Sequence, residues 1–167
     1  MTTRLLIIWH SRTGAARQMA QAAAAGARAV AGELGADARF DLQVRPADTV
    51  RTENLLEADG YLFAAPENLA ALSGAMKECL DRNYYHVLDR LNGRPYGALI
   101  TAGSDGEGAR RQLERICTGW RLKAIAPTLI IPMRAQTPEA ILAPKTVPED
   151  WLARGSELGG TLAALLL

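Results

Sequence analysis

The sequence predicts an α/β fold in which a five-stranded parallel sheet is covered by helices on both faces. Strand and helix patterns alternate along all 167 residues. Several strand patterns are short continuous apolar runs, as expected of strands that are buried on both sides. Alternation of this kind requires right-handed crossovers between parallel strands, which gives a doubly wound sheet. No linker or repeat interrupts the chain, so we expect one domain over residues 1–167.

The first half of the chain contains three of the expected strands. The first strand is a continuous apolar run, the second alternates polar and apolar residues and is more exposed, and Pro66 stops the third. Gly35 closes the long helix between the first two strands. The expected elements are strand 5–9, helix 14–34, strand 39–44, a helical turn at 54–57 and strand 60–65.

The second half contains the remaining two strands and three helices. Leu72, Met76 and Leu80 share one face of the first of these helices. Pro127 interrupts the backbone donors of the last strand, so we expect that strand at an edge of the sheet. The expected elements are helix 73–82, strand 96–101, helix 106–122, strand 124–131 and helix 148–166.

Composition excludes several classes of function. The chain has 19 basic and 18 acidic residues, a balance that gives no argument for binding nucleic acid or anionic membranes. No apolar run is long enough to span a membrane, and the first is too short for a signal peptide. Cys79 and Cys117 lie far apart and no residues have metal-ligand spacing. We therefore expect a cytoplasmic protein without membrane insertion, nucleic acid or metal.

Ligands bind doubly wound sheets beyond the carboxyl ends of the strands, so three loops are candidates for a binding site. The first loop follows Trp9 and opens a helix. Two hydroxyls, a glycine and the free N–H groups of a helix start gather there, which favours a phosphate monoester. The alternative is an ordinary helix cap formed by Ser11 or Thr13. The loop residues are Ser11, Arg12, Thr13, Gly14, Ala15 and Ala16.

The other two loops follow Ala65 and Thr101. Asn68 offers a donor and an acceptor to a planar heterocycle. Residues 103–108 include three glycines, which let the backbone pass close to a ligand. The alternatives are a plain strand-to-helix turn for the second loop, and for the third a connector in which Ser104 or Asp105 caps a helix.

In these motifs the chain resembles the flavodoxin-like superfamily, in particular its NAD(P)H-dependent FMN reductase and quinone reductase branches. The resemblance covers about residues 4–131. It implies strand order 2-1-3-4-5, NAD(P)H as co-substrate, and FMN held through its phosphate by the first loop. The motifs are Ser11-Arg12-Thr13-Gly14, Ala65-Pro66-Glu67-Asn68 and Thr101-Ala102-Gly103-Ser104-Asp105-Gly106. The implied cofactor-binding residues are Ser11, Arg12, Thr13, Gly14, Ala15, Ala16, Pro66, Glu67, Asn68, Leu69, Ala102, Gly103, Ser104, Asp105 and Gly106.

The resemblance favours an oxidoreductase that passes electrons from NAD(P)H to a quinone, free flavin or a similar small acceptor. No aromatic residue stands at 68–69 or 104–105, so we expect one open flavin face. The flavin carries the redox chemistry, so we name no catalytic side chain. We expect Glu67 and Asp105 to tune the flavin in the direction opposite to Arg12. Ala16 departs from the family, which often has a hydroxyl there.

Two other functions remain open: a flavodoxin-type electron carrier and a flavin-free binding domain of the same fold. The near-zero net charge argues against a carrier with an acidic docking face. Relatives in the reductase branches commonly complete the flavin site with a second subunit, so we expect a homodimer or higher homo-oligomer. The helix after Ser73 and the segment Tyr84-Tyr85-His86 are candidates for that contact. The alternatives for His10 are a functional role, as an anion contact or a proton relay, and a rim residue bonded by backbone.

Overall fold

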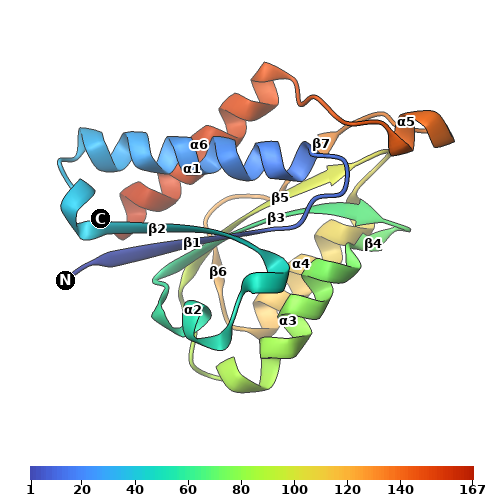
Figure 1. The fold of residues 1–167 in the computed structure, drawn as a ribbon. Coiled ribbons are helices and arrows are strands. Elements are labelled where there is room, and N and C mark those ends of the chain that lie inside the picture. Colours follow the sequence, from blue (N-terminus) through green and yellow to red (C-terminus); the bar gives the residue numbers. More distant parts are fainter.

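The computed structural model describes residues 1–167 and has three layers (Figure 1). Helices α1 and α6 cover one face of the sheet, and α2, α3 and α4 cover the other. None of the helices is both long and apolar enough to cross a membrane. The helices are α1 (Ala15–Glu33), α2 (Thr52–Glu57), α3 (Gly74–Val87), α4 (Glu107–Gly119), α5 (Pro138–Leu142) and α6 (Glu149–Leu166). The strands are β1 (Thr3–Trp9), β2 (Phe40–Pro46), β3 (Gly60–Asn68), β4 (Ala71–Leu72), β5 (Pro95–Ala102), β6 (Lys123–Ala124) and β7 (Leu129–Pro132).

The parallel strands run in the order β2-β1-β3-β5-β6, and β7 continues the last position by pairing with β5. The predicted doubly wound fold and its order 2-1-3-4-5 are therefore confirmed. The fifth strand differs in one respect, because it is split into β6 and β7. Pro127 lies in the gap, and a residue without an N–H cannot donate to the ladder with β5.

Strand β3 extends beyond the Pro66 stop that we expected. The ladder between β1 and β3 ends where Trp9 pairs with Ala64, so beyond that point β3 is an edge on this side. The missing N–H of Pro66 then costs no hydrogen bond. Strand β3 runs on to Asn68 and turns back into β4, an antiparallel addition to the parallel sheet.

Side chains of the central strands alternate between the two helical layers. On β1, Leu6 and Ile8 pack with the layer of α2, α3 and α4. Leu5 and Ile7 pack with the layer of α1 and α6. All four are fully buried, which explains why β1 reads as a continuous apolar run instead of an alternating one.

Helices α1 and α6 pack unusually closely because glycines line their contact. A Cβ atom at Gly159 would lie 1.9 Å from the carbonyl oxygen of Ala23. A Cβ at Gly26 would lie equally close to the carbonyl oxygen of Ser156, at 1.9 Å. The two backbones therefore touch directly, and α6 is held against the helix that begins at the first loop.

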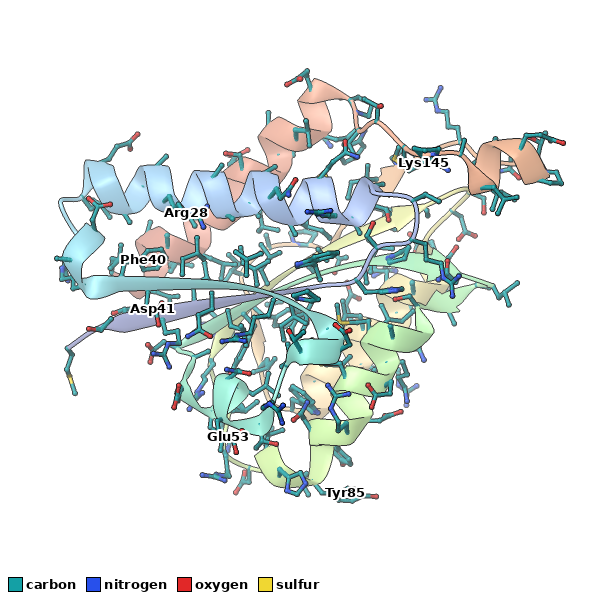
Figure 2. All side chains as sticks on the ribbon, viewed as in Figure 1. Arg28, Phe40, Asp41, Glu53, Tyr85 and Lys145 are labelled. Atoms are coloured by element: carbon teal, nitrogen blue, oxygen red, sulfur yellow. The ribbon has the colours of Figure 1, made fainter.

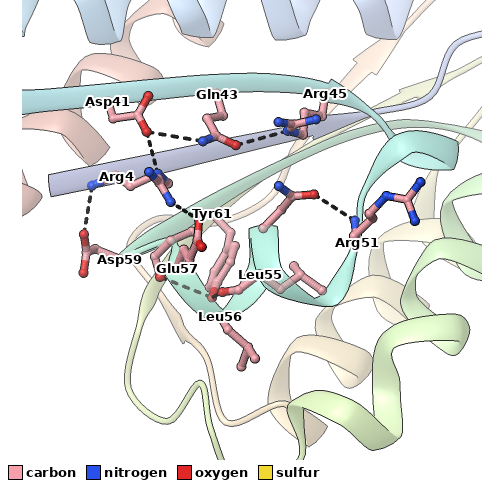
Figure 3. Close-up of polar contacts among 12 residues, drawn as sticks. Arg4, Asp41, Gln43, Arg45, Arg51, Leu55, Leu56, Glu57, Asp59 and Tyr61 are labelled. Atoms are coloured by element: carbon pink, nitrogen blue, oxygen red, sulfur yellow. Dashed lines mark hydrogen bonds and ion pairs between the residues drawn. The ribbon is translucent and has the colours of Figure 1, made fainter. Parts of the chain in front are cut away.

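A polar cluster around Arg4 fixes the amino-terminal edge of the sheet (Figure 3). The Arg4 guanidinium donates to Asp41 on β2 and pairs with Glu57 at the end of α2. Its backbone N–H donates to Asp59 Oδ2 at 2.8 Å. These contacts join β1, β2 and α2 at the edge opposite to the three loops, which belong to the carboxyl edge.

Candidate functional site

A cleft of about 690 Å³ lies at the carboxyl edge of the sheet. All three predicted loops contribute to its walls. Gly14, Asp105 and Gly106 lie within these loops but do not line the cleft. The lining residues are Ser11, Arg12, Thr13, Ala15, Ala16, Pro66, Glu67, Asn68, Leu69, Ala70, Thr101, Ala102, Gly103, Ser104, Met133, Ala135, Gln136, Ile141, Leu142 and Lys145.

Residues 11–17 form a cradle of hydrogen-bond donors that we call the anion cradle. Ser11 Oγ accepts a bond from Gly14 N at 3.1 Å, which leaves its O–H free to donate outward. Gly14 has a φ of 100°, a conformation that favours glycine. The N–H groups of Ala15 and Ala16 have no acceptor in the chain although both residues are buried. The Thr13 hydroxyl is also unpartnered, so these donors suit a phosphate.

We expected Glu67 to tune the flavin, but its carboxylate accepts hydrogen bonds at the start of α4. Its Oε1 accepts a bond from Gly106 N at 3.2 Å and its Oε2 from Ala109 N at 3.1 Å. The carboxylate thus caps α4 while its residue lines the cleft. Asp105 caps the same helix start, since its Oδ1 accepts a bond from Glu107 N at 2.9 Å. Both acidic groups are therefore engaged with the positive end of the α4 dipole.

The turn between β3 and β4 is strained. Leu69 and Ala70 have φ values of 51° and 60°, the left-handed region that residues with a Cβ seldom adopt. Each such residue costs about 1–2 kcal/mol. The turn exposes the Leu69 side chain fully to solvent at the rim of the cleft.

The glycines of the third loop serve packing within the protein. A Cβ at Gly103 would lie 2.8 Å from the carbonyl oxygen of Ala135, and one at Gly106 would lie 2.6 Å from Ile130 Cγ2. A Cβ at Gly108 would lie 1.9 Å from the carbonyl oxygen of Ala70. These glycines let the second loop and the chain after β7 approach the third loop closely.

A fourth wall of the cleft was not predicted. It consists of residues 133–147, which follow β7 and include α5; we call this segment the strap. Gln18 holds one end, because its Nε2 donates to Lys145 O at 2.8 Å and its Oε1 accepts from Val147 N at 3.0 Å. Gln136 holds the other end by donating to Gly103 O at 3.0 Å. Figure 2 shows Lys145 on the strap near α5.

The signal for this wall lay in the topology and not in the residue pattern. The strap has no strand or helix periodicity apart from the five residues of α5. It follows the fifth strand, however, and the carboxyl ends of parallel strands share one edge of the sheet. That rule could have assigned residues after 131 to the cleft.

His10 does not line the cleft. Its Nδ1 is 2.9 Å from Ser73 Oγ, a partner that the sequence did not reveal for either residue. Ser73 is fully buried. Burial and the positive charge of Arg12 lower the pKa of His10, and Asp48 opposes this shift.

Residues 10–136 match the family described as NADPH-dependent FMN reductase, and the match includes all three predicted loops. The chain belongs to this family. The family description names NADPH as the reductant and FMN as the molecule that is reduced. The resemblance inferred from the motifs is confirmed.

Two curated relatives match shorter parts of the chain. An NAD(P)H dehydrogenase (quinone) of Acidithiobacillus ferrooxidans is 32% identical, over 48% of this chain and 46% of its own length. A flavodoxin of Aquifex aeolicus is 28% identical, over 63% of this chain and 53% of its own length. The aligned part spans about half the length of each of these relatives.

Solved structures agree with the fold along the whole chain. An archaeal flavodoxin superposes with a TM-score of 0.76 at 16% identity, covering 98% of this chain and 99% of its own. An oxidoreductase of Corynebacterium diphtheriae gives a TM-score of 0.73 at 20% identity, covering 99% of this chain and 97% of its own. At these identities the likeness concerns the fold alone.

Proposed function

We propose that residues 1–167 form one domain that binds FMN in the cleft and transfers two electrons from NAD(P)H to a small acceptor, a quinone or free flavin. The anion cradle is the observation that carries the proposal. The N–H groups of Ala15 and Ala16 lack acceptors within the chain and belong to residues that line the cleft, so they are placed to donate to a bound phosphate. Family membership and the quinone-reducing relative support the choice of flavin chemistry.

FMN, when bound, supplies the chemistry by accepting a hydride from the nicotinamide and giving two electrons to the acceptor. The balanced reaction with a quinone is NAD(P)H + H⁺ + quinone → NAD(P)⁺ + hydroquinone. The protein contributes binding and charge. Within the anion cradle, the hydroxyls of Ser11 and Thr13 and the free N–H groups bind the phosphate, and Arg12 adds positive charge beside it. Glu67 fixes the second loop against α4 and so shapes the wall of the cleft.

Comparing FMN with riboflavin tests the cradle. Fluorescence titration is expected to show tighter binding of FMN, because riboflavin has no phosphate to satisfy the donors. Anaerobic mixing of the FMN-loaded protein with NADH and NADPH then tests reduction. Equal affinity for FMN and riboflavin would contradict the cradle, and FMN that stays oxidised with both nicotinamides would contradict the reductase.

A second candidate function is that of an electron carrier, which the Aquifex aeolicus flavodoxin relative favours. A carrier exchanges single electrons with protein partners and does not need nicotinamide in its site. Reductive titration distinguishes the two functions. A reductase is expected to show little of a one-electron-reduced form, and a carrier is expected to accumulate it.

We also propose a homodimer, supported by an exposed apolar patch at the end of α3. The patch consists of Tyr84, Tyr85 and Leu88, and the two tyrosine rings lie 5.1 Å apart. Figure 1 shows that α3 runs away from β4, and Tyr85 lies at the bottom of Figure 2, so the patch is not next to the second loop as the sequence suggested. A dimer through this patch leaves the cleft intact. Light scattering at micromolar concentration tests it, and a monomer would contradict it.

A cytoplasmic location is part of the proposal, and the two cysteines support it. Cys79 and Cys117 are both buried and unpaired. Burial raises the pKa of Cys79 to about 11, so its thiol is unreactive at neutral pH. Cell fractionation tests the location.

A further inference from the structure

Apolar side chains are exposed at two places on the rim of the cleft. Leu69 is 101% exposed, Leu142 is 78% exposed and Ile141 is 53% exposed. Leu69 belongs to the turn between β3 and β4, and the other two belong to α5 on the strap. Figure 1 shows β4 and α5 at the same end of the molecule, and all three residues line one cleft. Apolar side chains gathered in this way indicate a binding surface.

The backbone that carries these exposed side chains is strained at Leu69 and is not held by core packing at α5. The left-handed backbone of Leu69 and Ala70 keeps the turn in a strained conformation, and such strain is often kept at functional sites. Helix α5 has no buried residue, so core packing does not explain its position. The strap is instead held at its ends by Gln18 and Gln136.

A cation accompanies the apolar side chains on the strap. Lys145 Nζ donates to Ile141 O at 3.0 Å and also to Ala143 O. The only carboxylate that lines the cleft is that of Glu67, and α4 occupies both of its oxygens. The strap therefore presents apolar carbon and one ammonium group, without a nearby free carboxylate in the cleft.

The family match ends at residue 136, so α5 and Lys145 lie outside it. The anion cradle and both predicted ring-contacting loops lie inside it. FMN is named in the family description, so we assign the anion cradle and the backbone of the matched loops to it, which leaves the fully exposed Leu69 side chain for another ligand. The strap lies outside the matched residues and is available to a second molecule in the same cleft.

We infer that the strap and Leu69 form the acceptor subsite and that its occupant is a quinone. This inference rests on the proposed function. Ile141, Leu142 and Leu69 contact the apolar ring, and Lys145 faces the quinone oxygens, where negative charge develops during reduction. The quinone takes up two electrons and two protons, one of them derived from the hydride and one from solvent. No side chain is needed as a proton donor.

The main test uses Leu142→Ser and the double variant Ile141→Ser/Leu142→Ser in the FMN-loaded protein. The acceptors are 2-methyl-1,4-naphthoquinone and ferricyanide, which is small, charged and needs no apolar wall. We expect the KM for the naphthoquinone to rise by about tenfold, the scale of losing one apolar side-chain contact. The kcat, the rate with ferricyanide and the dissociation constant of FMN are expected to stay unchanged.

Equilibrium dialysis of the naphthoquinone supplies a readout that does not depend on turnover, and its dissociation constant is expected to rise by the same factor. Leu165→Ser is the matched control, since Leu165 is an exposed leucine on α6 that does not line the cleft. An unchanged KM and dissociation constant in the double variant would overturn the inference. Weaker FMN binding in the same variant would also overturn it, because the wall would then serve the cofactor.

Lys145 is tested separately with Lys145→Gln and Lys145→Arg. The glutamine variant is expected to raise the KM for the naphthoquinone, and arginine is expected to restore it. Weaker binding of FMN but not of riboflavin in Lys145→Gln would assign the ammonium to the phosphate and remove it from the acceptor subsite. Failure of the proposed function is distinguishable from failure of this inference. If the proposed function fails, the wild-type protein does not reduce ferricyanide with NADH or with NADPH.

Discussion

Thr13 supplies a hydroxyl that has no partner within the chain. In Thr13→Ala, FMN loses one hydrogen bond to a charged group, which is worth about 1.5–3 kcal/mol. The dissociation constant of FMN is expected to rise by roughly tenfold to a hundredfold. Riboflavin binding and the thermal stability of the apoprotein are expected to change little. Fluorescence titration measures the first effect and calorimetry the second.

Thr118→Ala is the control for this substitution. The Thr118 hydroxyl donates to Glu114 O within α4 and does not line the cleft. Its removal is expected to leave FMN affinity unchanged. If Thr13→Ala instead lowers the stability of the apoprotein and leaves FMN affinity intact, Thr13 serves only to cap the helix.

His10 makes the stability of the fold depend on pH. Its pKa is lowered in the folded state, mainly by burial and then by Arg12, while Asp48 acts in the opposite direction. The unfolded chain, with a histidine pKa of about 6.5, then binds the proton more readily. The free energy of unfolding is therefore expected to fall as the pH drops from about 6.5 through the folded-state pKa.

Urea unfolding at a series of pH values between about 7.5 and 5 measures this effect. His10→Gln is expected to remove this part of the pH dependence, and His86→Gln, which removes the other histidine, is expected to keep it. A parallel pH profile in wild type and His10→Gln would show that His10 does not contribute.

Single residues were predictable where their role depends on near neighbours. The hydroxyls and glycine of residues 11–14 form one local turn, and their cluster is visible in the sequence. The partners of Glu67 lie 39 and 42 residues away, and Ser73 lies 63 residues from His10. Contacts at such separations depend on the strand order and on loop shape, which no local pattern contains.

At the scale of elements, the contact between α1 and α6 depends on the absence of side chains. Gly159→Ala places a Cβ against the backbone of Ala23, which cannot move away as a side chain would. Even with the better helix propensity of alanine, the free energy of unfolding is expected to fall by about 1–3 kcal/mol. Chemical denaturation measures the change.

Gly119→Ala provides the matched control in a helix. No atom lies within 4 Å of the Cβ position at Gly119, the last residue of α4. This variant is expected to be neutral or slightly stabilising, because alanine favours helix more than glycine does. Equal losses of stability in both variants would mean that close packing of α1 and α6 is not the cause.

Long elements with a strong pattern were predictable and short ones were not. The buried runs of β1 and β5 and the helices α1, α4 and α6 lie within three residues of the predicted ranges, whereas β3 ends three residues and α3 five residues later than predicted. Strand β4 has two residues, β6 has two and α5 has five, too few for a period to show. Their positions follow from contacts: β4 pairs with the end of β3, and the strap is held by Gln18 and Gln136.

At the scale of the whole molecule, FMN is expected to stabilise the fold. A ligand that binds only the native state at a hundred times its dissociation constant adds about 2.7 kcal/mol to the free energy of unfolding. A thermal melt with FMN is therefore expected to show a higher Tm than one with an equal concentration of riboflavin. Thr13→Ala is expected to reduce the shift that FMN causes, and an FMN shift no larger than that of riboflavin would contradict the cradle.

The fold class and three walls of the cleft were predictable because they share one cause. A parallel sheet brings the ends of its strands to one edge, so residues after Trp9, Ala65 and Thr101 had to meet there. The fourth wall required knowing how the chain returns from β7 to α6. That path is fixed by Gln18, whose bonds reach across 127 and 129 residues.

The same bonds from Gln18 set the time at which the binding site is completed during synthesis. Lys145 and Val147 leave the ribosome 127 and 129 residues after Gln18. At roughly 5–20 residues per second, this is a delay of about 6 to 25 seconds. The nascent chain therefore carries the cradle sequence long before the strap is there to brace it. Loading of the cofactor into a finished site is therefore a step that follows translation of residues 1–147.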